Sequence, residues 1–205
     1  MTPTAAGADD VAERAIATYR ALLHRYHGTL DLMSDRGLGK LDSMLGDAAA
    51  YAEIVQMFVP HGLVLDLGSG AGLPAVVIAA SVPNRPMVWV ERRRRRAAFL
   101  EMVVAGCGFE TVTVFGRDVG AVGLDELVGG PAVGVTAQGV GGWVQLYRST
   151  RHLVGSDVTL IARRGETWEE EVRAFTTHVA ADVEVCRAVR LAGGGTLVAL
   201  RVRGG

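Results

Sequence analysis

A carboxylate and three glycines lie close together in residues 65–74, LDLGSGAGLP, and could form a site for a small ligand. The apolar residues around Asp66 are typical of a buried strand, and the apolar run after the glycines is typical of a helix. Gly68, Gly70 and Gly72 carry no side chain, so the loop backbone can approach a ligand closely. Glu91 ends the next predicted strand about 20 residues further on, where an acid can bind the two hydroxyls of a ribose.

The spacing of the glycines distinguishes two classes of nucleotide-like cofactor. Dinucleotide-binding loops follow G-x-G-x-x-G, whereas here the pattern is G-x-G-x-G, and Leu73 stands where the third dinucleotide glycine would be. Asp66 lies two residues before the first glycine, as in the D-x-G-x-G-x-G loop of S-adenosylmethionine (SAM) methyltransferases. A carboxylate there can hold the cationic amino-acid end of SAM, directly or through water. The sequence therefore predicts a SAM site, and the alternative is a turn that only connects a strand to a helix.

Alternating strands and helices are expected to position these residues. Strands are predicted at residues 63–68, 87–91, 112–116, 132–136 and 157–164, and helices at residues 73–81, 92–106, 142–154 and 167–179. The stretch 183–203 is typical of a hairpin, with two strands around three consecutive glycines. This order predicts an α/β fold with a doubly wound, Rossmann-like sheet of the class I SAM-methyltransferase kind. The sheet is expected to be mostly parallel, with an antiparallel C-terminal hairpin.

The residues before this alternation have helical periodicity. Residues 1–8 are typical of a loose tail, and Asp9 or Asp10 can cap a helix that ends at Gly28. A second helix is expected to cover residues 41–55. We therefore expect a helical N-terminal cap at residues 1–62 and a SAM-binding domain at residues 63–205, packed as one compact unit.

Composition and charge exclude several classes of protein. The chain has 22 acidic residues against 21 Lys and Arg, so it does not coat nucleic acid by bulk electrostatics, although a local basic patch can still bind it. The N-terminus lacks the features of a signal peptide, and no apolar run is long enough to span a membrane. The two cysteines, Cys107 and Cys186, lack the spacing of metal ligands. We expect a cytoplasmic monomer or homodimer with no metal site and no membrane contact.

Residues 64–118 resemble the RsmG/GidB family of methyltransferases, which modify guanine N7 in 16S ribosomal RNA. The segment carries that family's D-x-G-[ST]-G-x-G-[LF]-P loop, its acidic strand end and its basic residues before A-x-F-L. The resemblance implies SAM as the methyl donor and S-adenosylhomocysteine (SAH) as the product. It also implies that Glu91 binds the ribose and that Asp118 and Val119 border the adenine. The complete predicted cofactor set is Asp66, Gly68, Ser69, Gly70, Gly72, Leu73, Glu91, Arg92, Asp118, Val119 and Gln138.

The departures from the family's pattern fall on the acceptor side. Leu38 and Gly39 replace an Arg-His pair, Gln138 replaces an arginine beside cofactor and acceptor, and Arg164 replaces a lysine. Because polar groups left unpaired discriminate strongly between acceptors, these changes favour N-methylation of a small heteroaromatic molecule, purine-like or a natural product. The alternative is methylation of 16S ribosomal RNA in the 30S subunit. A non-enzymatic SAM sensor is a third class, without specific support.

No residue stands out in the sequence as a catalytic base. Guanine N7 and similar nitrogens have a free lone pair, so the enzyme has mainly to hold the acceptor and the methyl group in line. Gln138, Trp143 and Arg164 are the candidates for positioning the acceptor, and Trp143 either stacks on a flat acceptor or packs in the core. Five arginines, residues 92–96, follow the acidic strand end. The sequence leaves open whether this block binds RNA phosphates or faces only solvent.

Overall fold

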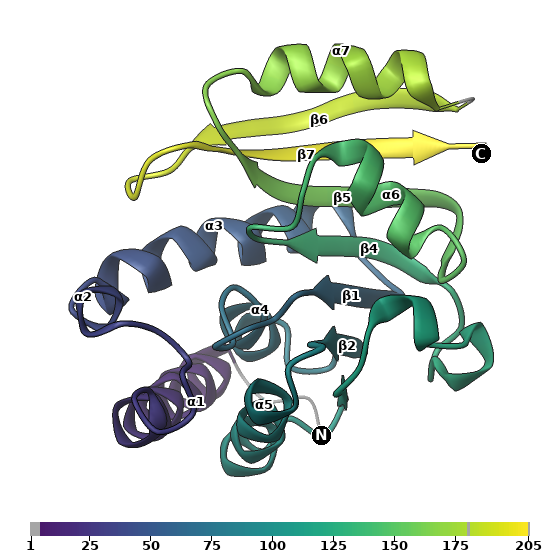
Figure 1. Ribbon diagram of the computed structural model, residues 1–205. Coiled ribbons are helices and arrows are strands. Elements are labelled where there is room, and N and C mark those ends of the chain that lie inside the picture. Colours follow the sequence, from purple (N-terminus) through teal and green to yellow (C-terminus); the bar gives the residue numbers. More distant parts are fainter. Residues whose placement is uncertain (1–4, 180, 205) are drawn as a thin grey trace.

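Seven strands form one sheet in the computed structural model, which describes residues 5–179 and 181–204 (Figure 1). The strand order is β3-β2-β1-β4-β5-β7-β6. β1 to β5 are parallel, and β7 pairs antiparallel with β5 and β6. The strands are β1 (Leu63–Leu67), β2 (Met87–Val90), β3 (Val112–Phe115), β4 (Ala132–Ala137), β5 (Val154–Arg164), β6 (Asp182–Arg190) and β7 (Thr196–Arg203). The predicted mostly parallel sheet with a C-terminal hairpin is confirmed.

Helices cover both faces of this sheet. The first face carries α1 (Ala5–Tyr26), α3 (Leu41–Phe58), α4 (Ala75–Ser81) and α5 (Arg94–Cys107), and the second carries α6 (Trp143–Thr150) and α7 (Trp168–His178). In Figure 1, α1, α4 and α5 lie together in the lower part of the view, and α6 and α7 lie in the upper part. Because alternate residues of a strand point to opposite faces, Val64 packs under the first group of helices and Leu65 under the second.

The N-terminal helices begin and end differently from the prediction. α1 begins at Ala5, so the predicted caps at Asp9 and Asp10 are wrong, and both residues lie inside the helix. The alanines of this segment favour the helical conformation. Residues 1–4 of the predicted tail lie outside the described residues. The second helix, α3, runs on to Phe58, three residues beyond the predicted end, and is preceded by the short α2 (Asp35–Leu38).

Three further boundaries differ for local physical reasons. α4 begins after Pro74, which has no N–H and so suits the very start of a helix. α5 begins at Arg94 and not at residue 92, because Arg93 is extended and its N–H donates to the Glu91 side chain. α6 ends at Thr150, since the chain enters β5 at Val154.

The connection between β3 and β4 contains two 3₁₀ turns that the sequence did not predict. These are η1 (Val119–Ala121) and η2 (Leu124–Glu126), each too short to show a helical periodicity. The chain thereby moves outward from β1 to β3 and returns to the other side of β1 as β4. Such a reversal of strand order is where open α/β sheets bind ligands. In the described ranges, no helix is both long and apolar enough to cross a membrane.

Candidate functional site

A cavity of about 480 Å³ opens at the carboxyl ends of β1 to β4. It lies at the point where the strand order reverses, and its volume is typical of small-ligand sites. Seven residues of the predicted cofactor set line it, namely Gly68, Gly70, Glu91, Arg92, Asp118, Val119 and Gln138. Asp66 and Ser69 are buried behind this wall. The fold therefore brings together residues from four separate strand ends.

The first two glycines after β1 expose backbone to the cavity. Gly68 and Gly70 have φ angles of 73° and 57°, which favour glycine. A Cβ on Gly68 would come within 2.9 Å of Val140 Cγ2, so a side chain at this position would overlap the opposite wall. The Gly70 N–H donates to Glu91 Oε2 at 3.0 Å. The loop is therefore shaped both by its missing side chains and by the acid at the end of β2.

The third glycine and the leucine after it face the N-terminal helices. A Cβ on Gly72 would lie 3.2 Å from Tyr19 Cε2 of α1. The Tyr19 hydroxyl donates to the Ala71 carbonyl at 2.9 Å, and Leu73 is buried in the core shared with α1. Neither Gly72 nor Leu73 lies among the residues that line the cavity. Their positions let α1 pack on the loop and support it from behind.

Glu91 joins three segments of the chain through its carboxylate and its backbone N–H. Its Oε2 accepts from Gly70, its Oε1 accepts from the Arg93 N–H at 2.8 Å, and its own N–H donates to the Phe115 carbonyl at 3.0 Å. The residue is only 6% exposed. Each carboxylate oxygen can accept a second hydrogen bond, so Glu91 can also take the two hydroxyls of a ribose at the cavity wall.

Asp66 is a buried acid with one oxygen unpaired. It is 1% exposed, and its Oδ1 accepts from the Thr136 hydroxyl at 2.5 Å. No described atom bonds Oδ2. Burial raises the pKa of the Asp66 carboxyl to about 6, against the effect of the Ser69 and Thr136 hydroxyls, and the Glu91 carboxylate adds to the increase. A buried unpaired acceptor is unusual in folded proteins, and a cationic ligand group would satisfy it.

The ionised Asp66 should reduce the stability of the ligand-free protein. Its pKa is about 6 in the folded state against an ordinary value of 3.8, so between these values the folded state binds more protons than the unfolded state. The free energy of unfolding therefore falls as the pH rises through this window, by about 3 kcal/mol in total. Urea unfolding of the wild type and of Asp66→Asn between pH 4 and pH 7.5 tests this prediction. The free energy of unfolding of the wild type minus that of the variant should fall as the pH rises.

Thr136→Val serves as a second variant in this measurement. Loss of the hydroxyl that bonds the carboxylate raises the pKa of Asp66 further, so the fall should extend to higher pH. A difference between the wild type and Asp66→Asn that does not change with pH would contradict the prediction.

The far wall of the cavity is formed after β3 and β4. Asp118 caps η1, with Oδ1 accepting from the Gly120 N–H at 2.9 Å, and Val119 follows it. Gln138 directly follows β4 and lines the same cavity. His152 is exposed, and its Nε2 lies 3.3 Å from the Val119 carbonyl, outside the cavity lining.

Two of the three acceptor candidates do not reach the cavity. Trp143 is 1% exposed and packs against Phe175 in the core on the α7 side. Arg164 lies over the Trp143 ring, with 4.3 Å between its Cζ and the ring centroid. Its Nη1 donates to the carbonyl of Gly141, which does line the cavity. Only Gln138 of the three candidates forms part of the wall itself.

Sequence reasoning missed several residues of this wall. The missed residues include Arg117, Gly139, Gly141, Gln145 and Ser149. Gln145 and Ser149 are four residues apart on α6, so they lie on one helix face. The spacing of this polar pair predicts a shared helix face, but it does not predict that this face lines the cavity.

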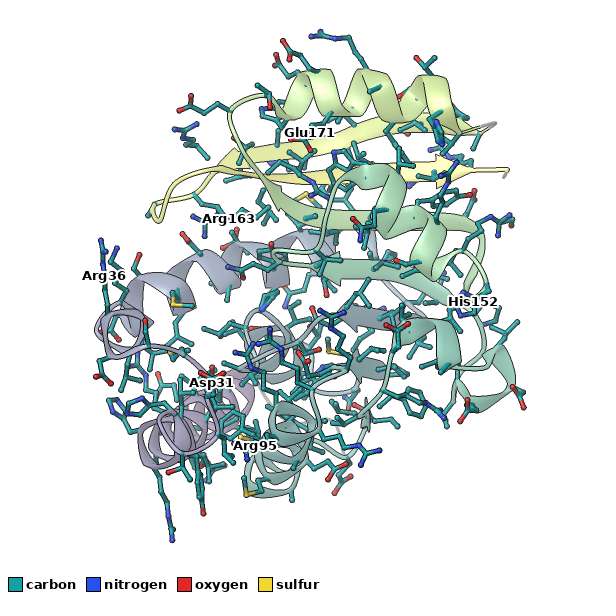
Figure 2. The ribbon with its side chains drawn as sticks, in the orientation of Figure 1. Asp31, Arg36, Arg95, His152, Arg163 and Glu171 are labelled. Carbon is teal, nitrogen blue, oxygen red and sulfur yellow. The ribbon has the colours of Figure 1, made fainter. Side chains whose placement is uncertain are left out.

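The arginine block divides into two groups. Arg92, Arg93 and Arg96 line the cavity, whereas Arg94 and Arg95 are exposed outside it. Arg96 donates from Nε and Nη2 to the Asp31 carbonyl, at 3.1 and 2.8 Å. Figure 2 shows Asp31 and Arg95 in the lower part of the view, on the segment before α2 and on α5. Part of the block is therefore structural, and part remains free to bind an anion.

The chemistry of this cavity suits SAM. Glu91 can take its ribose hydroxyls at the wall, and Asp66 lies behind the wall with one oxygen unpaired, where it can attract the ammonium group directly or through water. The glycine loop leaves room where a Cβ would intrude, and Asp118 and Val119 stand at the end of β3, where an adenine would lie. The donor and acceptor groups along the wall thus match the polar groups of the cofactor in kind.

The chain is similar to proteins of one family along most of its length. The model of the GidB family, rRNA small subunit methyltransferase G, matches residues 12–196. Ribosomal RNA small subunit methyltransferase G of Xylella fastidiosa (strain 9a5c) is 31% identical over 190 residues, which cover 92% of this chain and 86% of the relative. The protein of the same name from Halorhodospira halophila is 29% identical over 196 residues, covering 94% and 90%.

Solved structures show the same fold at lower sequence identity. Cofactor-bound Rv0187 from MTB has a TM-score of 0.59 and 17% identity, and the match covers 97% of this chain and 92% of that one. A SAM-dependent methyltransferase from Aquifex aeolicus has a TM-score of 0.59 and 15% identity, covering 83% and 99%. At this level of identity the likeness shows the fold alone.

Proposed function

This chain belongs to the rRNA small subunit methyltransferase G (GidB) family, and from that premise we propose that it methylates guanine N7 in 16S ribosomal RNA. It is a SAM-dependent methyltransferase, with SAM as its cofactor. The observation that carries the choice of acceptor is the extent of the family match. Residues 12–196 include the segments on the acceptor side as well as the cofactor loop.

The small heteroaromatic acceptor expected from the departures in sequence finds no support among the relatives, which are named for ribosomal RNA. The position of the departures also weakens that expectation. Leu38 and Gly39 lie at the end of α2, and Arg164 lies behind the cavity wall. Only Gln138 changes the cavity wall itself. The alternative acceptor, 16S ribosomal RNA in the 30S subunit, is therefore the one we adopt.

SAM supplies a methyl group on a sulfonium, which a nitrogen lone pair can displace in line. Asp66 would hold the ammonium end of the cofactor, Glu91 the ribose, and Asp118 with Val119 the adenine. Guanine N7 needs no base to become a nucleophile, and among the described residues no histidine lines the cavity. The contribution of the enzyme would then be to hold the two reacting groups in line at short distance.

The test is methyl transfer to small ribosomal subunits. Labelled SAM is incubated with the protein and 30S subunits from a strain that lacks its own enzyme of this kind. We expect label in 16S RNA at a guanine that becomes sensitive to borohydride and aniline, as N7-methylguanine does. If the protein binds SAH but leaves 16S RNA unlabelled, the proposed acceptor is overturned. Label at a position insensitive to this cleavage would overturn N7 as the methylated atom.

A further inference from the structure

Residues 138–142, here named the β4–α6 loop, have the sequence QGVGG, and residues 138–141 form one wall of the cavity. Gly139 and Gly141 have positive φ angles of 72° and 39°. Within the described part of the chain, residues 138–141 make no hydrogen bond to another backbone group. A glycine-rich loop of this kind depends on side chains from elsewhere to fix its position.

Two buried side chains hold the carbonyls on either side of Gln138. The Tyr51 hydroxyl of α3 donates to the Ala137 carbonyl at 3.1 Å and accepts from the Arg163 N–H at 3.0 Å. Arg164, at the end of β5, donates from Nη1 to the Gly141 carbonyl. Both anchors come from elements outside the loop, so the position of the loop depends on α3 and β5.

The burial of the Arg164 guanidinium is energetically unfavourable. Its side chain is 7% exposed, and its Nε lies 3.9 Å from Glu171 Oε2. In the described structure, Nε and Nη2 have no hydrogen-bond partner. Burial of a charge with donors left unpaired is unfavourable, and an apolar side chain would cover Trp143 without that penalty. What a long charged donor supplies here, and an apolar residue does not, is the hydrogen bond to the Gly141 carbonyl together with the ion pair to Glu171.

The loop is also held from its other side. A Cβ on Gly141 would overlap the Gln145 carboxamide, so the Gln145 side chain lies directly against the Gly141 backbone. Val140 packs closely enough on Gly68 that a Cβ there would lie 2.9 Å from Val140 Cγ2. Movement of Gly141 would therefore disturb the contact between Val140 and Gly68, and it would also shift Gln138.

We propose that Arg164 is a positioning residue, which together with Gln145 holds Gly141 and thereby fixes Gln138 on the cavity wall. It acts through the backbone of the β4–α6 loop and does not line the cavity itself. The inference rests on the proposed function only for the identity of the acceptor. The contacts that hold the loop are the same whichever acceptor it faces.

Hydrogen exchange read by mass spectrometry tests the inference on the whole protein. In Arg164→Met, we expect the hydrogen-bonded amides at the start of α6 to exchange on the order of tenfold faster, beginning with Leu146, which donates to the Gly142 carbonyl at 3.0 Å. Their exchange reports on the loop, because residues 138–141 have no backbone hydrogen bond of their own in the described structure. Peptides from β1 serve as the internal reference for global opening. Arg163→Met is the matched control, since Arg163 lies on the opposite face and bonds Asp47 and the Gly193 carbonyl at 3.4 and 2.5 Å. Figure 2 shows Arg163 on the α3 side of β5 and Glu171 on the α7 side.

Rescue and kinetics separate positioning from a general loss of stability. Arg164→Lys returns a charged donor and should bring exchange of the loop back toward that of the wild type. With 30S subunits as acceptor, kcat of Arg164→Met should fall on the order of tenfold, with a smaller change in the affinity for SAH. A purely structural role would lower the melting temperature and leave kcat unchanged at temperatures well below it.

Unchanged loop exchange in Arg164→Met, or an equal increase in Arg163→Met, would overturn the proposal. If Arg164→Met does not fold, Gln145→Ala carries the test, because Gln145 is exposed and its substitution removes only the second contact to Gly141. Faster loop exchange in Gln145→Ala supports the proposal, and unchanged exchange overturns it. A wild type that does not methylate 30S subunits would count against the proposed acceptor, while the exchange result would still decide the role of Arg164.

Discussion

Gly70→Val should lower the affinity for SAH by at least about 100-fold. Gly70 has a φ of 57°, which a β-branched residue adopts only under strain. Its N–H bonds the Glu91 carboxylate, so distortion of the loop would also move the acid expected to bind the ribose. The γ carbons of valine would in addition occupy the cavity that Gly70 lines. Titration calorimetry with SAH measures the loss.

Gly108→Val is the matched control for backbone strain. Gly108 caps the end of α5 with a φ of 69°, and no heavy atom lies within 4 Å of the place where its Cβ would be. The control variant should lose stability to a similar extent as Gly70→Val and still bind SAH. Binding by Gly70→Val at the affinity of the wild type would contradict the assignment of the cavity, as would loss of binding in Gly108→Val.

The local parts of the cofactor site could be predicted from the sequence. Asp66, the glycines and Glu91 lie in one strand-turn-helix-strand segment, where residue type and spacing largely decide the backbone conformation. The same locality explains why the C-terminal hairpin was predicted correctly. Its three consecutive glycines mark the turn between two strands.

The remaining parts depend on contacts between distant segments. Nothing in the local sequence indicates that Gly72 faces Tyr19 and not the cavity, because this depends on where α1 packs. Arg96 bonds a carbonyl 65 residues earlier in the chain. Gln145 lines the cavity because the chain leaves β3 on one side of β1 and forms β4 on the other side. Such long-range pairings carry no periodicity that a single sequence shows.

Neutralising Arg94 and Arg95 should weaken binding of 30S subunits and leave the cofactor site intact. Both residues are exposed, and neither has a carboxylate within 4.0 Å among the described residues. They open α5 without an acid in its first turn, where adjacent positive charges and the helix dipole are mutually unfavourable. A polyanion bound at this end of α5 would offset that cost, and ribosomal RNA is such a polyanion.

The double variant Arg94→Ala, Arg95→Ala should raise the KM for 30S subunits on the order of tenfold near physiological salt. The slope of log affinity against log salt should become shallower by about 2, because each arginine would no longer neutralise one RNA phosphate. Because neither arginine lines the cavity, the affinity for SAH should stay within about twofold of the wild type.

The double variant Arg173→Ala, Arg187→Ala removes the same charge from exposed positions on α7 and β6 and serves as the control. If the two double variants lower the affinity for 30S subunits equally, the effect belongs to net charge and not to this end of α5. If neither changes the salt dependence, Arg94 and Arg95 face only solvent. A shallower slope in the α5 variant alone would place the RNA backbone beside the mouth of the cofactor cavity, where Arg92 and Arg93 continue the same positive surface inward.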